Sequence, residues 1–152
     1  MEGLTHRVVN RTNAPHAETA HRTAELSGTD FRWIARAIQQ AGKSHMRVRV
    51  GALVVVSGRT SGGYNKYRNP PHLSYINAST HAEVDALRRA PRGGAGGAIY
   101  IARLGARGRL LPSFPCRRCV PILRDAGVKR IIWWDGYRWV ATKLSTLFIS
   151  AT

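Results

Sequence analysis

The hydrophobic residues of the stretch TDFRWIARAIQQAGKS follow the spacing of a helix. Phe31, Ile34 and Ile38 recur three or four residues apart, after two cap-type residues, Thr29 and Asp30. The glycine near the end of the stretch is typical of a helix terminus. The pattern therefore predicts a helix of about this length.

Two other stretches have the patterns of strands that turn back on themselves. Residues 47–65 (RVRVGALVVVSGRTSGGYN) begin with alternating Arg and Val, continue as an apolar run and contain the tight-turn signal SGR. Residues 128–141 (VKRIIWWDGYRWVA) place two β-rich runs around Asp135 and Gly136, a pair that favours a type I′ hairpin turn. We therefore predict two pairs of strands, of which the second is a hairpin.

Three elements are predicted between these pairs. They are a helix over about 79–90 that stops at Pro91, a strand at 98–103, and a helix over 116–127 with Pro121 in its first turn. The resulting order is α, β, β, α, β, α, β, β. This order predicts an α/β fold, a three-layer α/β/α domain with a mixed five-stranded sheet whose last two strands form a hairpin.

The ends of the chain carry weaker signals. Residues 1–28 are polar and basic and lack strong periodicity, so we interpret them as a flexible or weakly helical N-terminal arm. Residues 29–152 form the predicted domain, and its last segment, 142–152, fits a short helix or a strand equally well.

Composition adds a strong positive charge to this picture. The net charge is +16 for 152 residues, and all but four of the 24 basic residues are arginines. Such a surface favours polyanions such as nucleic acid or nucleotide phosphates, although a GC-rich genome would also enrich arginine. The sequence has no apolar run of about 18 residues and no secretory signal, so we expect a cytoplasmic protein without a membrane partner.

Four residues carry the candidate chemistry: His81, Glu83, Cys116 and Cys119. The two cysteines are three residues apart at a predicted helix start, so they can hold one ion, and the helix end should lower the thiol pKa. Two thiolates and one imidazole suit Zn²⁺ and leave a fourth position open for water, as in catalytic zinc sites. Glu83 is two residues from His81, so we expect it to act as a general base beside the metal.

Two alternatives remain open at this point. A structural zinc site with four protein ligands would need His72 as the fourth, but the spacing fits no common zinc finger. The second alternative is that Glu83 is an ordinary solvated helix residue without a catalytic role.

The two halves HAE (81–83) and PCRRC (115–119) match the signature H-x-E…P-C-x-x-C of zinc-dependent nucleobase deaminases. With GYN at 63–65 and AGVKRIIW at 126–133, the sequence resembles the cytidine deaminase superfamily from about residue 30 to residue 148. The resemblance implies hydrolytic deamination, in which zinc-activated water attacks the amino-bearing ring carbon and Glu83 carries the proton to the departing ammonia.

The resemblance also implies substrate contacts. Asn65 would bind the sugar or the base, and the backbone N–H of Ala82 would hold the base carbonyl. The GYN stretch resembles the deoxycytidylate deaminases. The terminal hairpin, in contrast, resembles the free-cytidine deaminases and deaminase toxins that act on nucleic acid. Small members of the superfamily often assemble, so a homo-oligomer is expected.

The substrate is therefore either a free cytidine derivative or a base within a polynucleotide. For a free nucleotide, Lys66 and Arg68 are the candidate phosphate ligands. For a polynucleotide, a basic groove with stacking aromatic residues is expected. The candidate cations are Arg88, Arg89, Arg92, Arg107, Arg109, Arg117 and Arg118, and the candidate aromatic residues, for which packing is the alternative, are Trp133, Trp134, Tyr137 and Trp139.

Three hypotheses follow from these residues. The first is a zinc-dependent deaminase of a cytidine-type nucleoside or nucleotide. The second is the same chemistry on cytosine, or less readily adenine, in single-stranded DNA or RNA. The third is a non-catalytic basic zinc module that binds nucleic acid.

Overall fold

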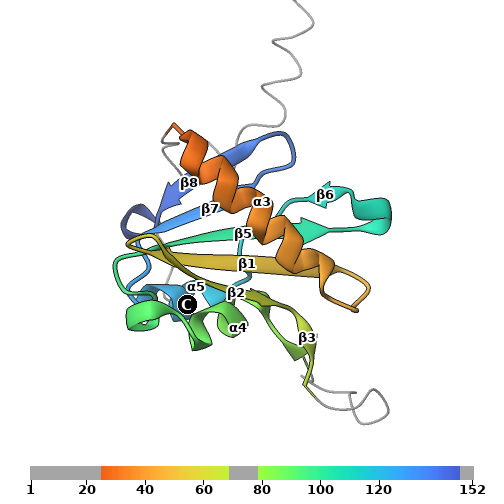
Figure 1. Ribbon diagram of the computed structural model, residues 1–152, viewed down its shortest axis with the longest axis horizontal. Coiled ribbons are helices and arrows are strands. Elements are labelled where there is room, and N and C mark those ends of the chain that lie inside the picture. Colours follow the sequence, from red (N-terminus) through yellow and green to blue (C-terminus); the bar gives the residue numbers. More distant parts are fainter. Residues whose placement is uncertain (1–24, 69–78, 148–152) are drawn as a thin grey trace, which may run out of the picture.

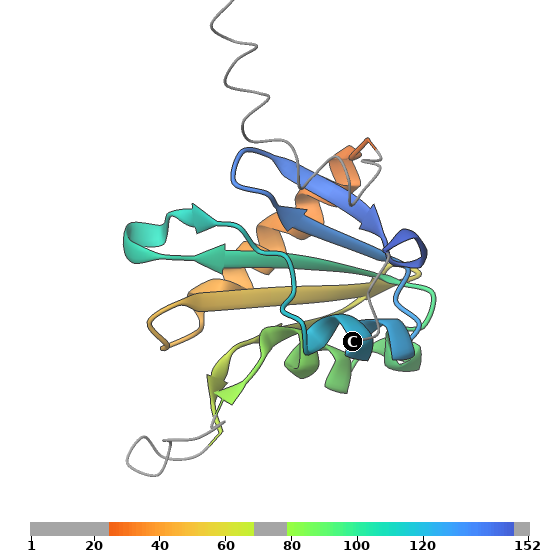
Figure 2. The same ribbon diagram turned by 180° about the vertical axis from the view of Figure 1, so that it is seen from behind.

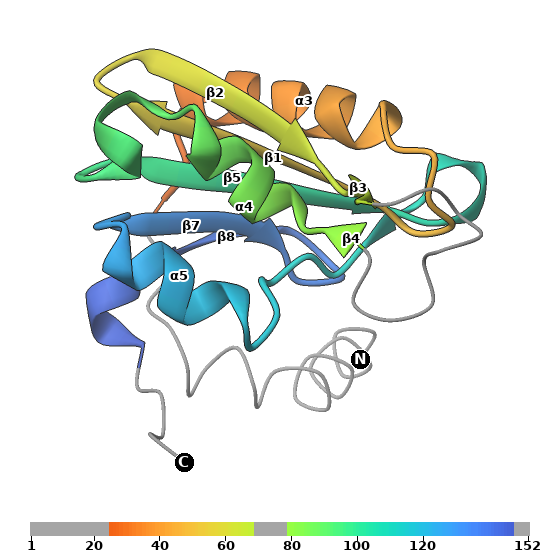
Figure 3. The ribbon, with the colours of Figure 1, turned by 90° about the horizontal axis from the view of Figure 1, so that it is seen from below.

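The computed structural model describes residues 25–68 and 79–147, which form one sheet covered by helices on both faces (Figure 1). Helix α3 (Gly28–Gly42) packs across one face. Helices α4 (Ala82–Arg88) and α5 (Cys119–Asp125) cover the other face, which the reverse view displays in green and blue (Figure 2). Seen along the layers, the sheet lies between these two groups of helices (Figure 3). The predicted three-layer α/β/α architecture is confirmed.

The sheet is mixed, as predicted, and its main path has the order β2-β1-β5-β7-β8. Its five strands are β1 (Arg49–Val56), β2 (Arg59–Tyr64), β5 (Ala98–Leu104), β7 (Arg130–Trp134) and β8 (Trp139–Lys143). Strands β5 and β7 are parallel, whereas the other neighbours on the path are antiparallel. The parallel pair is connected through α5, the usual way of joining parallel strands.

Several short elements complete the fold. Strand β6 (Leu110–Leu111) extends the sheet beside β5, while β3 (Lys66–Tyr67) and β4 (Ser79–Thr80) form a separate two-stranded pair. Three 3₁₀ turns lie at η2 (Pro91–Gly94), η3 (Ala106–Gly108) and η4 (Leu144–Thr146). The helix predicted over about 79–90 is therefore shorter, because its first residues pair as β4. The segment predicted at 142–152 begins in β8 and continues into η4, and its last five residues lie outside the described ranges.

Both predicted pairs of strands are present, and the tip of the second hairpin lies one residue later than expected. The turn with two positive φ angles, the mark of type I′, is Ser57-Gly58 between β1 and β2, with φ values of 50° and 80°. At the second hairpin, Asp135 donates its backbone N–H to the carbonyl of Arg138, so Gly136 and Tyr137 form the tip. The Asp135 carboxylate accepts the N–H groups of Tyr137 and Arg138, which explains why this residue precedes the tip.

Helix α3 is capped two residues earlier than the sequence suggested. The N-cap is Ser27, and Asp30 completes a capping box with it, so Thr29 is not the cap. The Asp30 carboxylate also accepts the Tyr100 hydroxyl at 2.7 Å and lies 3.4 Å from Arg130. Through these contacts the start of α3 is tied to β5 and β7. The arm predicted at 1–28 lies mainly outside the described residues.

Side chains that alternate along the strands divide the core into two layers. Leu53, Tyr100 and Ile132 face α3 and pack with Ile34. Val54, Ile99, Ile101, Ile131 and Val140 belong to the opposite layer, with Ala82 and Ala86 of α4 and Val120 and Leu123 of α5. This second layer fixes the starts of α4 and α5 next to each other. Within the described residues, no helix combines the length and apolar character needed to cross a bilayer.

Candidate metal centre and active site

The first half of the candidate site is the junction between β4 and α4. His81 has extended backbone angles and is the N-cap of α4, but its side chain makes no capping hydrogen bond. The imidazole is therefore directed away from its own helix. Ala82 and Glu83 follow in the first turn, and both are buried. The structure buries Ala82, Glu83, Asp85 and Ala86 of this helix. Val84 and Leu87, which their apolar character suggests as core residues, are only half-buried.

The second half is the turn that leads into α5. Cys116 precedes the helix and its carbonyl accepts the N–H groups of Cys119 and Val120, so the two thiols are gathered by one turn of chain. Pro121 lies in the first turn of α5, as predicted, where its missing N–H costs nothing. The turn is anchored by Ser113, whose hydroxyl donates to the carbonyl of Ile101 and accepts the N–H of Trp134.

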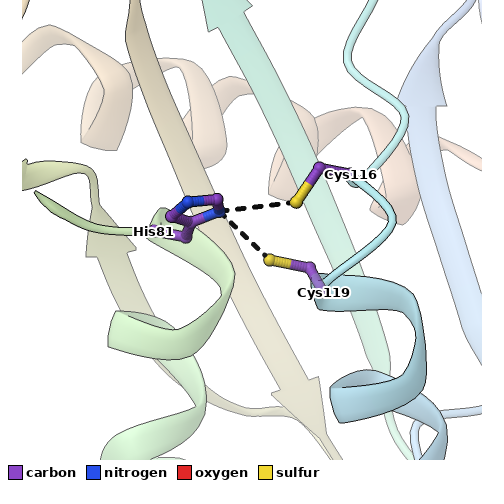
Figure 4. Close-up of side chains that lie close together, drawn as sticks. All are labelled: His81, Cys116 and Cys119. Carbon is purple, nitrogen blue, oxygen red and sulfur yellow. Dashed lines mark hydrogen bonds between the residues drawn. The ribbon is translucent and has the colours of Figure 1, made fainter. Parts of the chain in front are cut away.

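The three candidate metal ligands converge on one point (Figure 4). Nδ1 of His81 lies 3.6 Å from Sγ of Cys116 and 3.3 Å from Sγ of Cys119. The three ligand atoms all lie within 4.8 Å of one another. Ligand atoms around one tetrahedral zinc, with bonds of about 2.0–2.3 Å, have this kind of spacing, and one nitrogen with two sulfurs is a zinc donor set. The residues present therefore fit Zn²⁺.

The expected lowering of the thiol pKa is wrong for Cys119. Burial, and after it the negative charges of Glu83 and Cys116, raise the pKa of the Cys119 thiol well above its ordinary value. A thiolate at Cys119 thus needs a cation beside it, and this requirement agrees with a metal site rather than with a free reactive thiol.

Glu83 is a buried carboxyl beside the ligand cluster. It is 5% exposed, and burial raises its pKa, opposed by weaker contributions that include the Cys119 thiol as hydrogen-bond donor. A carboxyl in this state holds a proton more readily than an exposed one. The solvated-residue alternative for Glu83 is therefore wrong. His72, the alternative fourth ligand, lies outside the described residues.

A cleft of about 380 Å³, here called the zinc cleft, opens onto these groups. His81, Glu83 and Cys116 line it, and the substrate candidates Asn65 and Ala82 line it as well. The remaining wall is formed by Met46, Arg47, Val48, Val50, Tyr67, Ser79, Ile101, Arg103, Ser113 and Phe114. The sequence thus identified five residues that line the cleft, but not the residues that form the rest of its wall.

Asn65 is held firmly at the cleft wall by the backbone of β1 and the loop before it. Its Oδ1 accepts the N–H of Val50 at 2.8 Å, and its Nδ2 donates to the carbonyl of Val48 at 2.8 Å. One amide hydrogen and one lone pair of the side chain remain for another partner. Ala82 is the first residue of α4, where the N–H has no partner within the helix.

The two cations predicted to bind phosphate face a neighbouring opening instead. Lys66 and Arg68 line a second groove, here called the basic groove, of about 520 Å³. The Lys66 ammonium lies 3.1 Å from the buried Asp85 carboxylate, which also accepts the Tyr64 N–H. Arg68 is exposed and donates to the Ser79 carbonyl at 3.5 Å. The other residues of this groove are Tyr67, Ser79, Thr80, His81, Val84, Arg88, Arg118, Cys119 and Ile122.

The arginines and the aromatic residues predicted to contact nucleic acid differ in where they lie. Of the seven arginines, Arg88 and Arg118 line the basic groove. The candidate aromatic residues do not line either opening: Trp133 is buried, Trp134 packs edge-on against Trp139, and Tyr137 is exposed at the hairpin tip. The packing alternative therefore holds for the three tryptophans.

Sequence reasoning missed Arg47, Tyr67, Arg103 and Phe114 at the cleft. For Phe114, the signal was its position directly before the PCRRC motif, whose first cysteine lines the same wall. Arg47 and Arg103 lie far from the motifs in sequence, whereas Tyr67 follows Asn65 of the GYN stretch by two residues. The pairing of β1 with β5 and of β3 with β4 brings these segments to the cleft.

With this geometry in view, comparison with known proteins defines the class of protein. The family model described as "Cytidine and deoxycytidylate deaminase zinc-binding region" matches residues 27–134. The chain therefore belongs to the cytidine and deoxycytidylate deaminase family, a family of zinc-dependent deaminases, and its metal is zinc. No curated protein sequence matches the chain.

Solved structures support the fold at low sequence identity. A cytidine deaminase from Burkholderia pseudomallei superposes with a TM-score of 0.63 at 20% identity, over 84% of this chain and 100% of that one. One from Mycobacterium leprae gives 0.57 at 21% identity, over 79% and 96%. A point mutant of the Mycobacterium tuberculosis enzyme gives 0.52 at 23% identity, over 80% and 93%. These likenesses establish a cytidine deaminase-like α/β fold.

Proposed function

We propose that the protein hydrolyses the exocyclic amino group of a cytosine base, in a cytidine or deoxycytidine nucleoside or nucleotide, to give uracil and ammonia. One observation carries the proposal: the buried carboxyl of Glu83 lines the same cleft as His81 and Cys116, beside the point where three metal ligands converge. Family membership supports the deaminase chemistry, and the proposal adds the substrate and the residue roles.

His81, Cys116 and Cys119 would hold the zinc, which would supply a Lewis acid that lowers the pKa of water. Glu83 is the proton carrier. It accepts a proton from the attacking water and delivers it to the amine, so that a C–O bond forms as the C–N bond breaks and ammonia leaves. A carboxyl whose pKa is raised by burial is suited to both halves of this transfer near neutral pH.

The substrate is positioned by groups that do not react. The Ala82 N–H, which has no partner within its helix, donates to the base carbonyl. The remaining amide hydrogen of Asn65 binds the sugar or the base, and its two bonds to the backbone around β1 keep it in place. Lys66 and Arg68 lie further out, in the basic groove, where they meet phosphate rather than the base. Assembly into a homo-oligomer stays a prediction, which sedimentation velocity of the zinc-loaded protein tests.

The test is ammonia release and the accompanying ultraviolet shift, measured with zinc-loaded protein on cytidine, deoxycytidine, dCMP and adenosine. Turnover of a cytosine substrate with equal amounts of uracil product and ammonia is expected. Turnover of adenosine alone would replace cytosine by adenine as the target base. Zinc-loaded protein that is inert on every monomer and on cytosine-containing oligonucleotides would contradict the proposal and favour a non-catalytic zinc module.

A further inference from the structure

The zinc cleft and the basic groove share a wall. Tyr67, Ser79 and His81 line both openings. The metal ligands are divided between them, since Cys116 lines the zinc cleft and Cys119 lines the basic groove. The two openings are therefore adjoining parts of one surface that passes over the metal centre.

Cations lie along both parts of this surface. Arg47 and Arg103 line the zinc cleft, while Arg68, Arg88 and Arg118 join Lys66 in the basic groove. Among the described lining residues, Glu83 is the only acid of the zinc cleft and the basic groove has none. Within residues 25–68 and 79–147, the side chains of Arg47, Arg88 and Arg103 have no hydrogen-bond or ion-pair partner. Their charges remain available to an anionic ligand.

Exposed aromatic rings accompany these cations. Tyr67, on the shared wall, is 48% exposed, and Phe114, on the zinc cleft, is 36% exposed. Phe114 is held edge-on by the buried Trp133, with ring centroids 4.8 Å apart. A rigid exposed ring beside a basic groove is what stacked bases of a single strand bind.

We propose that the substrate is a cytosine within a single-stranded polynucleotide, which crosses the metal centre from the zinc cleft to the basic groove. Phosphates on one side of the target base contact Arg47 and Arg103, and those on the other side contact Arg68 and Arg88. Neighbouring bases stack on Tyr67 and Phe114. A free mononucleotide has phosphate on one side of its sugar only, so it does not account for cations on both sides. The inference rests on the proposed deaminase chemistry and changes its substrate from a free nucleoside or nucleotide to a cytosine within a strand.

The first test compares kcat/KM for deoxycytidine, dCMP and deoxyoligonucleotides of three, five, nine and fifteen residues with one central cytosine. A parallel ribose series distinguishes DNA from RNA. The proposal expects kcat/KM to rise with length to a plateau, at least tenfold above dCMP. Turnover of monomers with equal or lower kcat/KM for every oligonucleotide overturns the inference but leaves the deaminase function intact. Absence of turnover on all substrates overturns both.

The second test measures binding without turnover, by anisotropy of a labelled fifteen-residue strand in a zinc-loaded Glu83→Gln background. Adding Tyr67→Ala should weaken binding roughly fivefold to a hundredfold, the usual effect of losing one stacked base. Adding Arg88→Gln should flatten the plot of log affinity against log salt by about 0.7 for one lost phosphate contact. The charge-matched control is Arg32→Gln, at an exposed position of α3 on the opposite face of the sheet. This change should leave the slope of log affinity against log salt unchanged. Equal effects of Arg88→Gln and Arg32→Gln would mean that only net charge matters, and would overturn the path.

Discussion

Asp30 and Glu83 are buried carboxyls on opposite faces of the same sheet, 7% and 5% exposed. Burial acts to raise the pKa of both groups. In Asp30, hydrogen bonds from Ser27 and Tyr100 and the charge of Arg130 outweigh burial and hold the pKa below its usual value. In Glu83 the opposing contributions are weaker, and the pKa stays raised.

The two carboxyls differ both in their partners and in desolvation: Glu83 is desolvated more strongly, and Asp30 has more groups that favour its charged form. The Asp30 carboxylate accepts the Ser27 N–H at 2.9 Å and the Tyr100 hydroxyl at 2.7 Å, so it is fixed in its charged form. Glu83 instead opens into a cleft beside three metal ligands, where an incoming substrate can reach it. A carboxylate held in its charged form stabilises the fold, whereas a carboxyl with a raised pKa at a cleft can move a proton. Variants on the two faces should therefore affect different measurements.

The largest effect is expected from Cys119→Ala, which removes the buried thiol proposed as a zinc ligand. Zinc content should fall from about one ion per chain to near zero, and turnover should be lost. The variant should also lose the stabilisation that bound metal gives, about 2.7 kcal/mol at a zinc concentration of 100 times its Kd. Metal analysis and thermal unfolding with and without chelator measure this, and chelator should lower Tm only for the parent protein. Full zinc occupancy in the variant would contradict the ligand assignment.

The next largest effect is expected from Glu83→Gln, which keeps the shape of the side chain but cannot accept a proton. It should lower kcat by about 10²- to 10⁴-fold, the range for a lost general acid–base group, and should retain zinc. Because burial of the charged form is unfavourable here, the metal-free variant should be at least as stable as the parent. Loss of zinc together with activity would show that Glu83 is a ligand and not a proton carrier.

Two glycines provide a matched pair of variants for the two faces. A Cβ at Gly51 of β1 would fall on backbone atoms of Ala37 and Ala41 in α3, and one at Gly63 of β2 would fall on Ala82 and Ala86 in α4. Both Gly→Ala changes should cost about 1–3 kcal/mol of unfolding free energy through overpacking. Only Gly63→Ala displaces the helix that carries the metal ligand, so only it should weaken zinc affinity and kcat/KM.

Gly28→Ala is the control for this pair, because its Cβ would meet nothing within 4 Å. It should leave both stability and zinc affinity close to those of the parent. Equal loss of zinc affinity in Gly51→Ala and Gly63→Ala, measured by competition with a chelating dye, would show that the two faces are not independent.

The same contrast explains how much the sequence could predict. The element order, the mixed sheet and the convergence of His81, Cys116 and Cys119 were predictable, because the hydrophobic period and the motifs HAE and PCRRC can be read directly from the sequence. The partners of the Asp30 carboxylate were not predictable, because the order of the strands in the sheet brings Tyr100 and Arg130 to it. The one-residue difference at the Asp135 turn arose because its side chain replaces a backbone bond, which propensity does not reveal.

The cleft entrance was unpredictable for a related reason. Tyr67 and Phe114 carry no motif, and the tryptophan-rich hairpin was a stronger aromatic signal. The hairpin aromatics pack within the fold, however, because cross-strand pairs such as Trp134 and Trp139 bury each other. Only the structure shows that the rings of Tyr67 and Phe114 are exposed.

The smallest effect, and the one that distinguishes the faces most clearly, is expected from Asp30→Asn. The change removes the charge that holds Ser27, Tyr100 and Arg130, and should cost about 1–2 kcal/mol of unfolding free energy at neutral pH, with zinc affinity and kcat unchanged. Because the folded pKa of Asp30 is lowered, its stabilisation is complete above the unfolded pKa, near 3.9, and is lost as pH falls through the folded pKa. The stability difference between parent and variant should therefore shrink toward zero in acid, as measured by urea unfolding from pH 7 to pH 2.

Asp125→Asn, at an exposed position of α5, is the control and should change stability by less than about 0.5 kcal/mol. A difference between parent and Asp30→Asn that persists at pH 2 would mean that the Asp30 contacts act through shape and not through charge, and the contrast with Glu83 would then fail.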